Sequence, residues 1–116
     1  MGGNVYVLLN NLRQSGLDKF IIEKSKEKDF IYSGFSAGAI IATPDVRIAG
    51  KENNWYFGYD ENEVSITDTK ALRLVDFEIL PHYNKKCDQK KLEKYTKKYN
   101  IQAKPLTDND FLIITK

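Results

Sequence analysis

Apolar positions in the first part of the chain recur every three or four residues. Between residues 5 and 12 this spacing predicts an amphipathic helix, which Asn4 would cap at its start and Gly16 would end. Residues 17–28 continue the pattern and predict a second helix. The chain therefore opens with two consecutive helices whose apolar faces need a partner in the core.

Further along, short apolar runs alternate with stretches of helical character. Strands are expected at 30–35, 74–80 and 111–115, helices at 37–42 and 88–99, and irregular structure or short strands over 44–70. Strands separated by helices predict an α/β fold with a largely parallel sheet.

Composition narrows the class of protein. The chain has 116 residues, 41% of them hydrophobic, which predicts one domain spanning residues 1–116. No apolar run approaches the roughly 18 residues of a membrane span, and the first residues lack the regions of a signal peptide, so we expect a cytoplasmic protein without a membrane partner. Because Cys87 and His82 are the only cysteine and histidine, we expect no disulfide, metal or cofactor.

The net charge of +2 hides a basic segment. Residues 85–104 contain eight lysines against Asp88 and Glu93, which gives this segment a charge of +6 and leaves −4 for the rest. Nucleic-acid binding would need aromatic side chains among the cations, and only Tyr95 and Tyr99 qualify. Their spacing instead predicts the apolar stripe of a helix whose lysines face water, so no nucleic-acid partner is expected.

Residues 34–38, Gly-Phe-Ser-Ala-Gly, fit the G-x-S-x-G pattern of a nucleophilic serine on a sharp turn between a strand and a helix. The glycines matter because a side chain at either position would collide with backbone in so tight a turn. The expected strand 30–35 and helix 37–42 supply the setting that the pattern requires. Ser36 is therefore the candidate nucleophile, and the alternative is a glycine-rich turn without a catalytic serine.

A serine hydroxyl needs a base to take its proton, and His82 is the single imidazole in the chain. His82 follows the apolar run 74–80, so we expect it at the carboxyl end of a strand. Ser36 follows the expected strand 30–35, and the carboxyl ends of parallel strands meet at one edge of a sheet. His82 is therefore the candidate base, and the alternative is a surface or packing histidine.

Several carboxylates could orient the histidine. Candidates between the serine and the histidine are Asp45, Glu52, Asp60, Glu61, Glu63 and Asp68. Asp60 and Glu61 are favoured because Gly58 and the aromatic residues before them indicate a structured turn.

Short blocks along nearly the whole chain form a recognisable series. In order they are Gly2-Gly3-Asn4-Val5, Leu8-Leu9, Ser15-Gly16-Leu17-Asp18, Tyr32-Ser33-Gly34-Phe35-Ser36-Ala37-Gly38-Ala39, Leu74-Val75-Asp76-Phe77, Leu80-Pro81-His82-Tyr83-Asn84 and Leu106-Thr107-Asp108. Together they resemble the peptidase E (aspartyl dipeptidase) and cyanophycinase family of serine peptidases, whose fold is similar to that of class I glutamine amidotransferases. The serine block and the Pro-His-Tyr block are specific in combination.

The resemblance implies a three-layer α/β sandwich with a mostly parallel central sheet. It also implies that Ser36 is the nucleophile and His82 the base, with the acid between them in the sequence. Counting back from the histidine favours Asp60, with Glu61 as the alternative.

The resemblance implies two further features of the site. Main-chain N–H groups of Ala37 and of the Gly2-Gly3 turn would form the oxyanion hole. The substrates would be short peptides, with dipeptides that begin with aspartate as the expected class.

Family members usually have further strands and helices before the Gly-Gly-Asn block, so we expect a fold truncated at its amino terminus. A sheet without its first strands exposes unpaired edge groups and apolar surface, which a second copy or a partner chain would cover. The alternative function is a catalytically impaired relative that acts as a binding or assembly module. An amidotransferase-like amidase is disfavoured because it usually has a cysteine where Ser36 stands.

Overall fold

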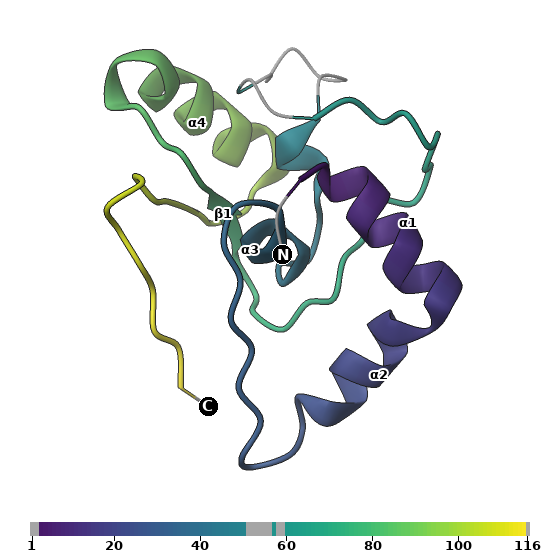
Figure 1. Cartoon of the computed structure of the whole chain (residues 1–116). Coiled ribbons are helices and arrows are strands. Elements are labelled where there is room, and N and C mark those ends of the chain that lie inside the picture. Colours follow the sequence, from purple (N-terminus) through teal and green to yellow (C-terminus); the bar gives the residue numbers. More distant parts are fainter. Residues whose placement is uncertain (1–2, 51–56, 58–59, 116) are drawn as a thin grey trace.

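The computed structural model describes residues 3–50, 57 and 60–115, in which helices surround a short parallel sheet (Figure 1). The elements are α1 (Val5–Ser15), α2 (Leu17–Lys24), α3 (Ala37–Ile41), the 3₁₀ helix η1 (Arg47–Ala49), β1 (Glu78–Leu80), α4 (Lys85–Tyr99) and β2 (Ala103–Pro105). None of the helices in these ranges has the length and apolar character that crossing a membrane requires.

Helix α1 begins and ends where the sequence predicts. The Asn4 side chain accepts hydrogen bonds from the backbone N–H groups of Tyr6 and Val7 at 2.9 and 3.2 Å, so it satisfies donors that a helix start leaves free. Gly16 ends the helix with φ at 79°, a left-handed conformation that glycine adopts at little cost. The buried face of α1 packs against α3 and forms much of the core.

Helix α2 confirms the second predicted helix but is shorter than expected. It ends at Lys24, and turns follow it up to residue 29. None of its side chains is buried, and Phe20 is exposed. The apolar face of α2 is therefore much less buried than that of α1, which packs in the core.

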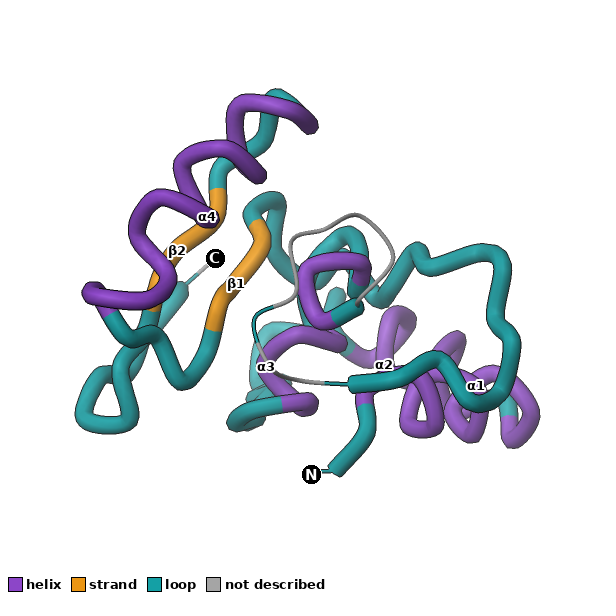
Figure 2. The backbone as a smooth tube through the Cα atoms, turned by 90° about the horizontal axis from the view of Figure 1, so that it is seen from above, coloured by secondary structure: helices purple, strands orange, loops and turns teal. Residues whose placement is uncertain are grey.

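The sheet of the described residues consists of β1 and β2, which pair in parallel with Leu80 opposite Pro105. Figure 2 shows α4 beside the strands on one side and α1, α2 and α3 on the other. Leu80 is fully buried and belongs to the same core as Tyr95 of α4. The predicted combination of helices with a parallel sheet is therefore confirmed.

Two of the three predicted strands are wrong. Residues 30–35 and 111–115 are not assigned to any strand, and within the described residues neither segment hydrogen-bonds to a neighbouring strand. Of the predicted strand 74–80, the last three residues form β1. Its partner is β2, a segment that the apolar pattern did not predict, because strand pairing depends on a neighbour that local sequence does not reveal.

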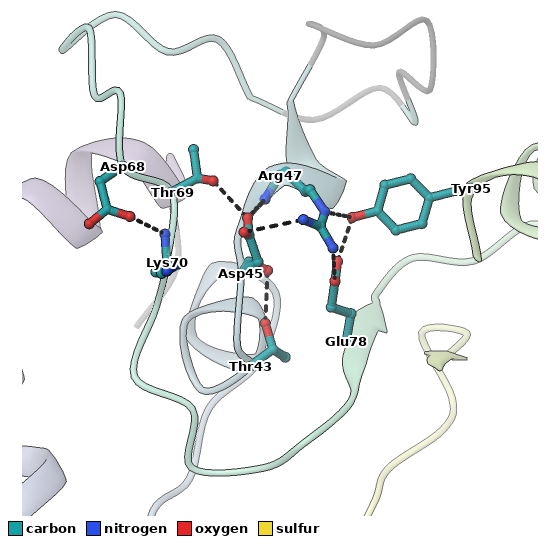
Figure 3. A network of polar contacts seen from close by, with 8 residues as sticks. All are labelled: Thr43, Asp45, Arg47, Asp68, Thr69, Lys70, Glu78 and Tyr95. Carbon is teal, nitrogen blue, oxygen red and sulfur yellow. Dashed lines mark hydrogen bonds and ion pairs between the residues drawn. The ribbon is translucent and has the colours of Figure 1, made fainter. Parts of the chain in front are cut away.

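A polar network holds the amino-terminal end of β1 (Figure 3). The carboxylate of Glu78, which is only 2% exposed, accepts hydrogen bonds from Arg47 Nη2 at 3.1 Å and from the Tyr95 hydroxyl at 2.5 Å. Arg47 Nε donates to the Tyr95 oxygen at 3.1 Å, and the guanidinium lies 4.0 Å from the centre of the Tyr99 ring. Because these residues come from η1, β1 and α4, the network ties three elements together.

Burial raises the pKa values of two side chains in this network. It raises the pKa of the Glu78 carboxyl, although the hydrogen bond from Tyr95 and the charge of Arg47 act in the opposite direction. Burial and the adjacent Glu78 both raise the pKa of Tyr95, so its hydroxyl remains a donor.

Replacing Glu78 with Gln should change how stability depends on pH. A carboxyl with a raised folded-state pKa binds its proton more tightly in the folded chain, so its contribution is largest below the unfolded-state value of 4.5 and is lost as pH rises through the folded-state pKa. The wild-type free energy of unfolding should therefore fall relative to that of Glu78→Gln as pH rises across this range. Urea titrations at a series of pH values measure this difference.

Glu93→Gln, on an exposed position of α4, is the control and should leave the pH dependence unchanged. Curves for wild type and Glu78→Gln that stay parallel from below pH 4.5 to neutrality would contradict the assignment.

Candidate active site

Ser36 lies on a sharp turn that leads into α3. Its φ and ψ angles are 52° and −119°, a conformation that L residues rarely adopt and that costs backbone energy. The turn is closed by a hydrogen bond of 2.9 Å from Gly38 N to the Phe35 carbonyl oxygen. This is the strained geometry that presents a nucleophile between an extended segment and a helix.

Close backbone packing explains the glycine at the start of this turn. A Cβ atom on Gly34 would lie 2.5 Å from the carbonyl oxygen of Gly38 and 2.7 Å from its carbonyl carbon. The Tyr32 hydroxyl donates to that same oxygen at 2.5 Å, and burial raises the pKa of this tyrosine. The turn around Ser36 is thus held by backbone contacts that a larger residue would break.

His82 lies beside Ser36, as its place after β1 predicts. Its Nε2 atom is 3.1 Å from Ser36 Oγ, and its Nδ1 atom is 2.6 Å from Asp108 Oδ1. An ionised carboxylate can only accept, so Nδ1 carries the proton and Nε2 is left to accept from the serine hydroxyl. The three side chains form one hydrogen-bonded series, Asp108 to His82 to Ser36.

The pairing of β1 with β2 explains why His82 and Asp108 meet. Beyond the strands, Leu106 N donates to the Leu80 oxygen and Tyr83 N donates to the Leu106 oxygen, both at 2.9 Å. The two chains therefore stay side by side until just past their strand ends. His82 itself has φ at 56°, a left-handed conformation that turns the chain towards α4.

Helix α4 begins only three residues after His82. The Asn84 side chain accepts from Lys86 N at 3.1 Å, and the buried Asp88 carboxylate accepts from Asn84 N at 2.9 Å. This reciprocal cap starts the helix at Lys85, earlier than the predicted residue 88, and anchors the chain next to the histidine.

Comparison with known proteins shows which family the chain belongs to. The sequence profile of peptidase family S51 matches residues 1–116. The chain belongs to peptidase family S51. An uncharacterized peptidase of Listeria innocua is 33% identical over 117 aligned residues, which cover 97% of this chain and 52% of that protein. An uncharacterized peptidase of Listeria monocytogenes is 34% identical, with 97% of this chain and 53% of that protein covered.

A solved structure is similar to the fold as well. The crystal structure described as "a Putative Peptidase E Protein from Listeria monocytogenes EGD-e" superposes with a TM-score of 0.64 at 32% identity, covering 92% of this chain and 50% of that chain. The chain thus has the α/β fold of peptidase E, which is similar to class I glutamine amidotransferases. It spans about half the length of the S51 relatives that it matches.

The predicted acid is not the one beside the histidine. Asp60 Oδ2 accepts a hydrogen bond of 2.8 Å from Val5 N at the start of α1, where a carboxylate is favourable. The main-chain oxygen of Glu61 accepts from the Asn4 side chain at 2.9 Å at the same helix end. The prediction that Asp60 contacts His82 is therefore wrong, and Asp108 occupies Nδ1 instead.

Two of the other candidate acids are engaged elsewhere, and Glu63 is exposed to solvent. Asp45 accepts from Thr69 Oγ1 at 2.8 Å and lies 3.5 Å from Arg47 Nη1 (Figure 3). Asp68 accepts from Lys70 N at 3.1 Å. Glu52 lies outside the described residues.

Asp108 is absent from the predicted acids because those candidates all precede the histidine in the sequence. The rule that located His82, a polar residue just past a strand, also applies to Asp108, which follows β2 by three residues. Residues 103–105 read Ala-Lys-Pro and have no apolar pattern that predicts a strand. Because the sequence of β2 does not predict a strand, the sequence alone does not show that Asp108 follows a strand end.

The predicted oxyanion donors can be placed in part. Ala37 is the first residue of α3, and within the described residues no hydrogen bond uses its N–H. Gly3, with φ at 91°, lies two residues before α1, the helix that packs against α3. Gly2 lies outside the described residues.

The serine site is open to solvent. Ser36 is partly buried, whereas the side chains of His82 and Asp108 are 48% and 75% exposed. A cavity of about 510 Å³ lies at the other end of β1, where Arg47 and Glu78 line it together with other residues. None of Ser36, His82 and Asp108 lines this cavity, so it is separate from the candidate active site.

Metal ligation has no obvious place among the residues that the structure describes. In ranges 3–50 and 60–115, no group of three or more histidine, cysteine, aspartate or glutamate side chains could hold a metal ion.

Gly34→Ala should destabilise the turn that carries Ser36. The added methyl group would meet the Gly38 carbonyl, and overpacking of this kind costs about 1–3 kcal/mol. Urea unfolding followed by circular dichroism measures the change. Ser33→Ala, an exposed neighbour, should leave the unfolding midpoint unchanged. Equal midpoints for Gly34→Ala and wild type would show that the turn tolerates a side chain.

Proposed function

We propose that this S51 chain is a serine peptidase that hydrolyses short peptides, with dipeptides that begin with aspartate as its substrate class. The observation that carries this proposal is the hydrogen-bonded series of Asp108, His82 and Ser36 on a strained turn. A nucleophile, a base and a group that orients the base are the parts that acyl transfer by serine requires.

Each side chain has one role in the proposed reaction. Ser36 Oγ attacks the scissile carbonyl carbon while His82 Nε2 takes the hydroxyl proton. His82 then gives this proton to the leaving amine, which leaves an ester on Ser36. Water attacks this ester with His82 again as the base, the bond between Ser36 Oγ and the acyl carbon breaks, and Oγ takes back the proton from His82 as the acid product leaves. Asp108 stabilises the imidazolium in both steps by accepting from Nδ1.

The negative oxygen of the tetrahedral intermediate needs donors in fixed positions. The N–H of Ala37 is suitable because no hydrogen bond in the described part of the chain uses it. We assign the second donor to the Gly2-Gly3 turn, as the resemblance implies. One such donor contributes about 3–4 kcal/mol of transition-state stabilisation in serine peptidases.

The substrate class rests on relatives rather than on contacts. The structural neighbour is described as a peptidase E protein, and the sequence resembles aspartyl dipeptidases over most of its blocks. Arg47 is bound to Glu78 and Tyr95 at the end of β1 that lies away from His82. We therefore assign no arginine from η1 to the recognition of an acidic substrate.

A binding or assembly module without activity is the second candidate function. It is favoured by one observation, the exposure of apolar side chains such as Phe35 directly beside Ser36. A fluorophosphonate probe separates the two functions because it reacts only with an activated serine.

Wild type should be labelled by the fluorophosphonate, and Ser36→Ala should not. Intact-protein mass spectrometry measures the added mass, and Ser33→Ala is the matched control because this serine lies on the same extended segment. Equal labelling of wild type and Ser36→Ala, or no labelling of either, would remove the nucleophile assignment.

Asp108→Asn should lower the reaction rate, whereas Asp60→Asn should lower the stability of the fold. Asp108→Asn should lower the labelling or hydrolysis rate by about 10²–10⁴-fold, because the amide no longer holds His82 in the productive tautomer. Asp60→Asn should keep the rate and lower the free energy of unfolding by about 1 kcal/mol through its weaker bond to Val5 N. The labelling or hydrolysis rates and the urea unfolding midpoints of both variants test these two expectations.

If Asp60→Asn reacted slowly and Asp108→Asn kept full activity, the acid that orients His82 would be Asp60 and not Asp108.

A further inference from the structure

A tyrosine side chain bridges the turn that carries Ser36. Tyr32 lies four residues before the serine, on the extended segment that leads into α3 (Figure 1). Its hydroxyl donates at 2.5 Å to the main-chain oxygen of Gly38, which lies two residues after the serine. One side-chain contact therefore joins the two arms of the turn across Ser36.

The shortness of α3 explains why the Gly38 oxygen is available to the tyrosine. In a continuing α-helix this oxygen would accept from the N–H group of residue 42. Helix α3 ends at Ile41, however, and Ala42 N donates to the Ala39 oxygen at 3.3 Å. Because Gly38 is buried, an unpaired carbonyl group there would be costly, and the Tyr32 hydroxyl supplies a partner.

The aromatic ring of Tyr32 lies against the glycine that begins the turn. A Cβ atom on Gly34 would be 3.0 Å from the ring atom Cε1, so the ring occupies the space beside this backbone while its hydroxyl reaches Gly38. Tyr32 is partly buried, and burial raises the pKa of its hydroxyl. The group therefore stays protonated and donates at neutral pH.

Ser36 has a backbone conformation that needs such support. Its φ and ψ angles of 52° and −119° lie outside the regions that L residues favour, and a residue stays there only when its surroundings hold it. Within the turn, the backbone bond of 2.9 Å from Gly38 N to the Phe35 oxygen is one such restraint. The Tyr32 bond adds a second restraint, which comes from a side chain and reaches back to the segment before the turn.

We propose that Tyr32 is a positioning residue, which holds Ser36 in the strained conformation that places Oγ 3.1 Å from His82 Nε2. Without the tyrosine hydroxyl, the turn relaxes for part of the time and Oγ moves out of hydrogen-bond distance of the imidazole. The effect on rate rests on the proposed function, because an aligned serine is required only where the imidazole takes its proton. The contact between Ser36 and His82 can be measured without any reaction.

Tyr32→Phe tests the positioning, because it removes the hydroxyl and keeps the ring. His82 is the only histidine, so its ring nitrogens give the only imidazole signals in the nitrogen NMR spectrum of the isotope-labelled, untagged chain. The Nε2 signal of the neutral ring depends on whether this nitrogen accepts a hydrogen bond, and Ser36→Ala shows where the signal lies without the serine. We expect Tyr32→Phe to move the signal from the wild-type position towards that of Ser36→Ala.

The reaction with the fluorophosphonate gives a second readout. Loss of one buried hydrogen bond shifts a conformational equilibrium by about fivefold or more, so the maximal labelling rate of Tyr32→Phe should fall at least about fivefold. The probe concentration that gives half of the maximal rate should change less than about twofold, because the Tyr32 hydroxyl binds Gly38 and not the probe.

Tyr99→Phe is the matched control, because it removes a tyrosine hydroxyl from α4 and leaves the turn around Ser36 intact. This variant should have the Nε2 signal and the labelling rate of wild type. Urea unfolding followed by circular dichroism establishes that Tyr32→Phe and Tyr99→Phe are both folded under the conditions of the two assays.

An Nε2 signal of Tyr32→Phe that coincides with that of wild type would overturn the proposal, whatever the labelling rate. Coinciding signals of wild type and Ser36→Ala would also overturn it, because the serine would then not be held beside the imidazole. If Tyr32→Phe moves the signal but the fluorophosphonate does not label wild type, the positioning role of Tyr32 stands and the proposed peptidase function fails.

Discussion

Parallel pairing of β1 with β2 is the interaction on which the candidate site depends. Each strand has only three residues, but backbone hydrogen bonds continue past their ends through Leu80, Tyr83 and Leu106. Parallel strands end at the same edge, so the residues that follow them are brought together whatever their separation in sequence. His82 and Asp108, 26 positions apart, come within 2.6 Å for this reason.

The two ends of β1 have contrasting environments. At its start, the Glu78 carboxylate is buried with Arg47 and Tyr95, so η1 and α4 are held against the strand. At its end, the chain emerges to an exposed His82 and turns into α4. A buried charged group is costly unless its partners are in place, which makes its position specific. The buried, hydrogen-bonded start of β1 thus anchors the strand that leads to the imidazole.

The candidate site is strained and incompletely enclosed. Ser36 and His82 both have positive φ angles, which cost energy that the surrounding structure must offset. The backbone of the tight turn and the cap of α4 supply part of this support. The segments that lead into Ser36 and away from Asp108 have no strand neighbour within the described residues. The proposed nucleophile is therefore positioned by its turn and not by a paired strand that precedes it.

The sequence by itself determined the features that depend on neighbouring residues: the caps at Asn4 and Gly16, the turn around Ser36, and the place of His82 just after an apolar strand. Only the tertiary structure decided which carboxylate meets the imidazole. Asp60 stands in a promising turn by sequence, yet its carboxylate caps α1, while Asp108 follows a strand with no apolar pattern. Local propensity governs turns and caps, whereas strand pairing between distant segments depends on the whole fold.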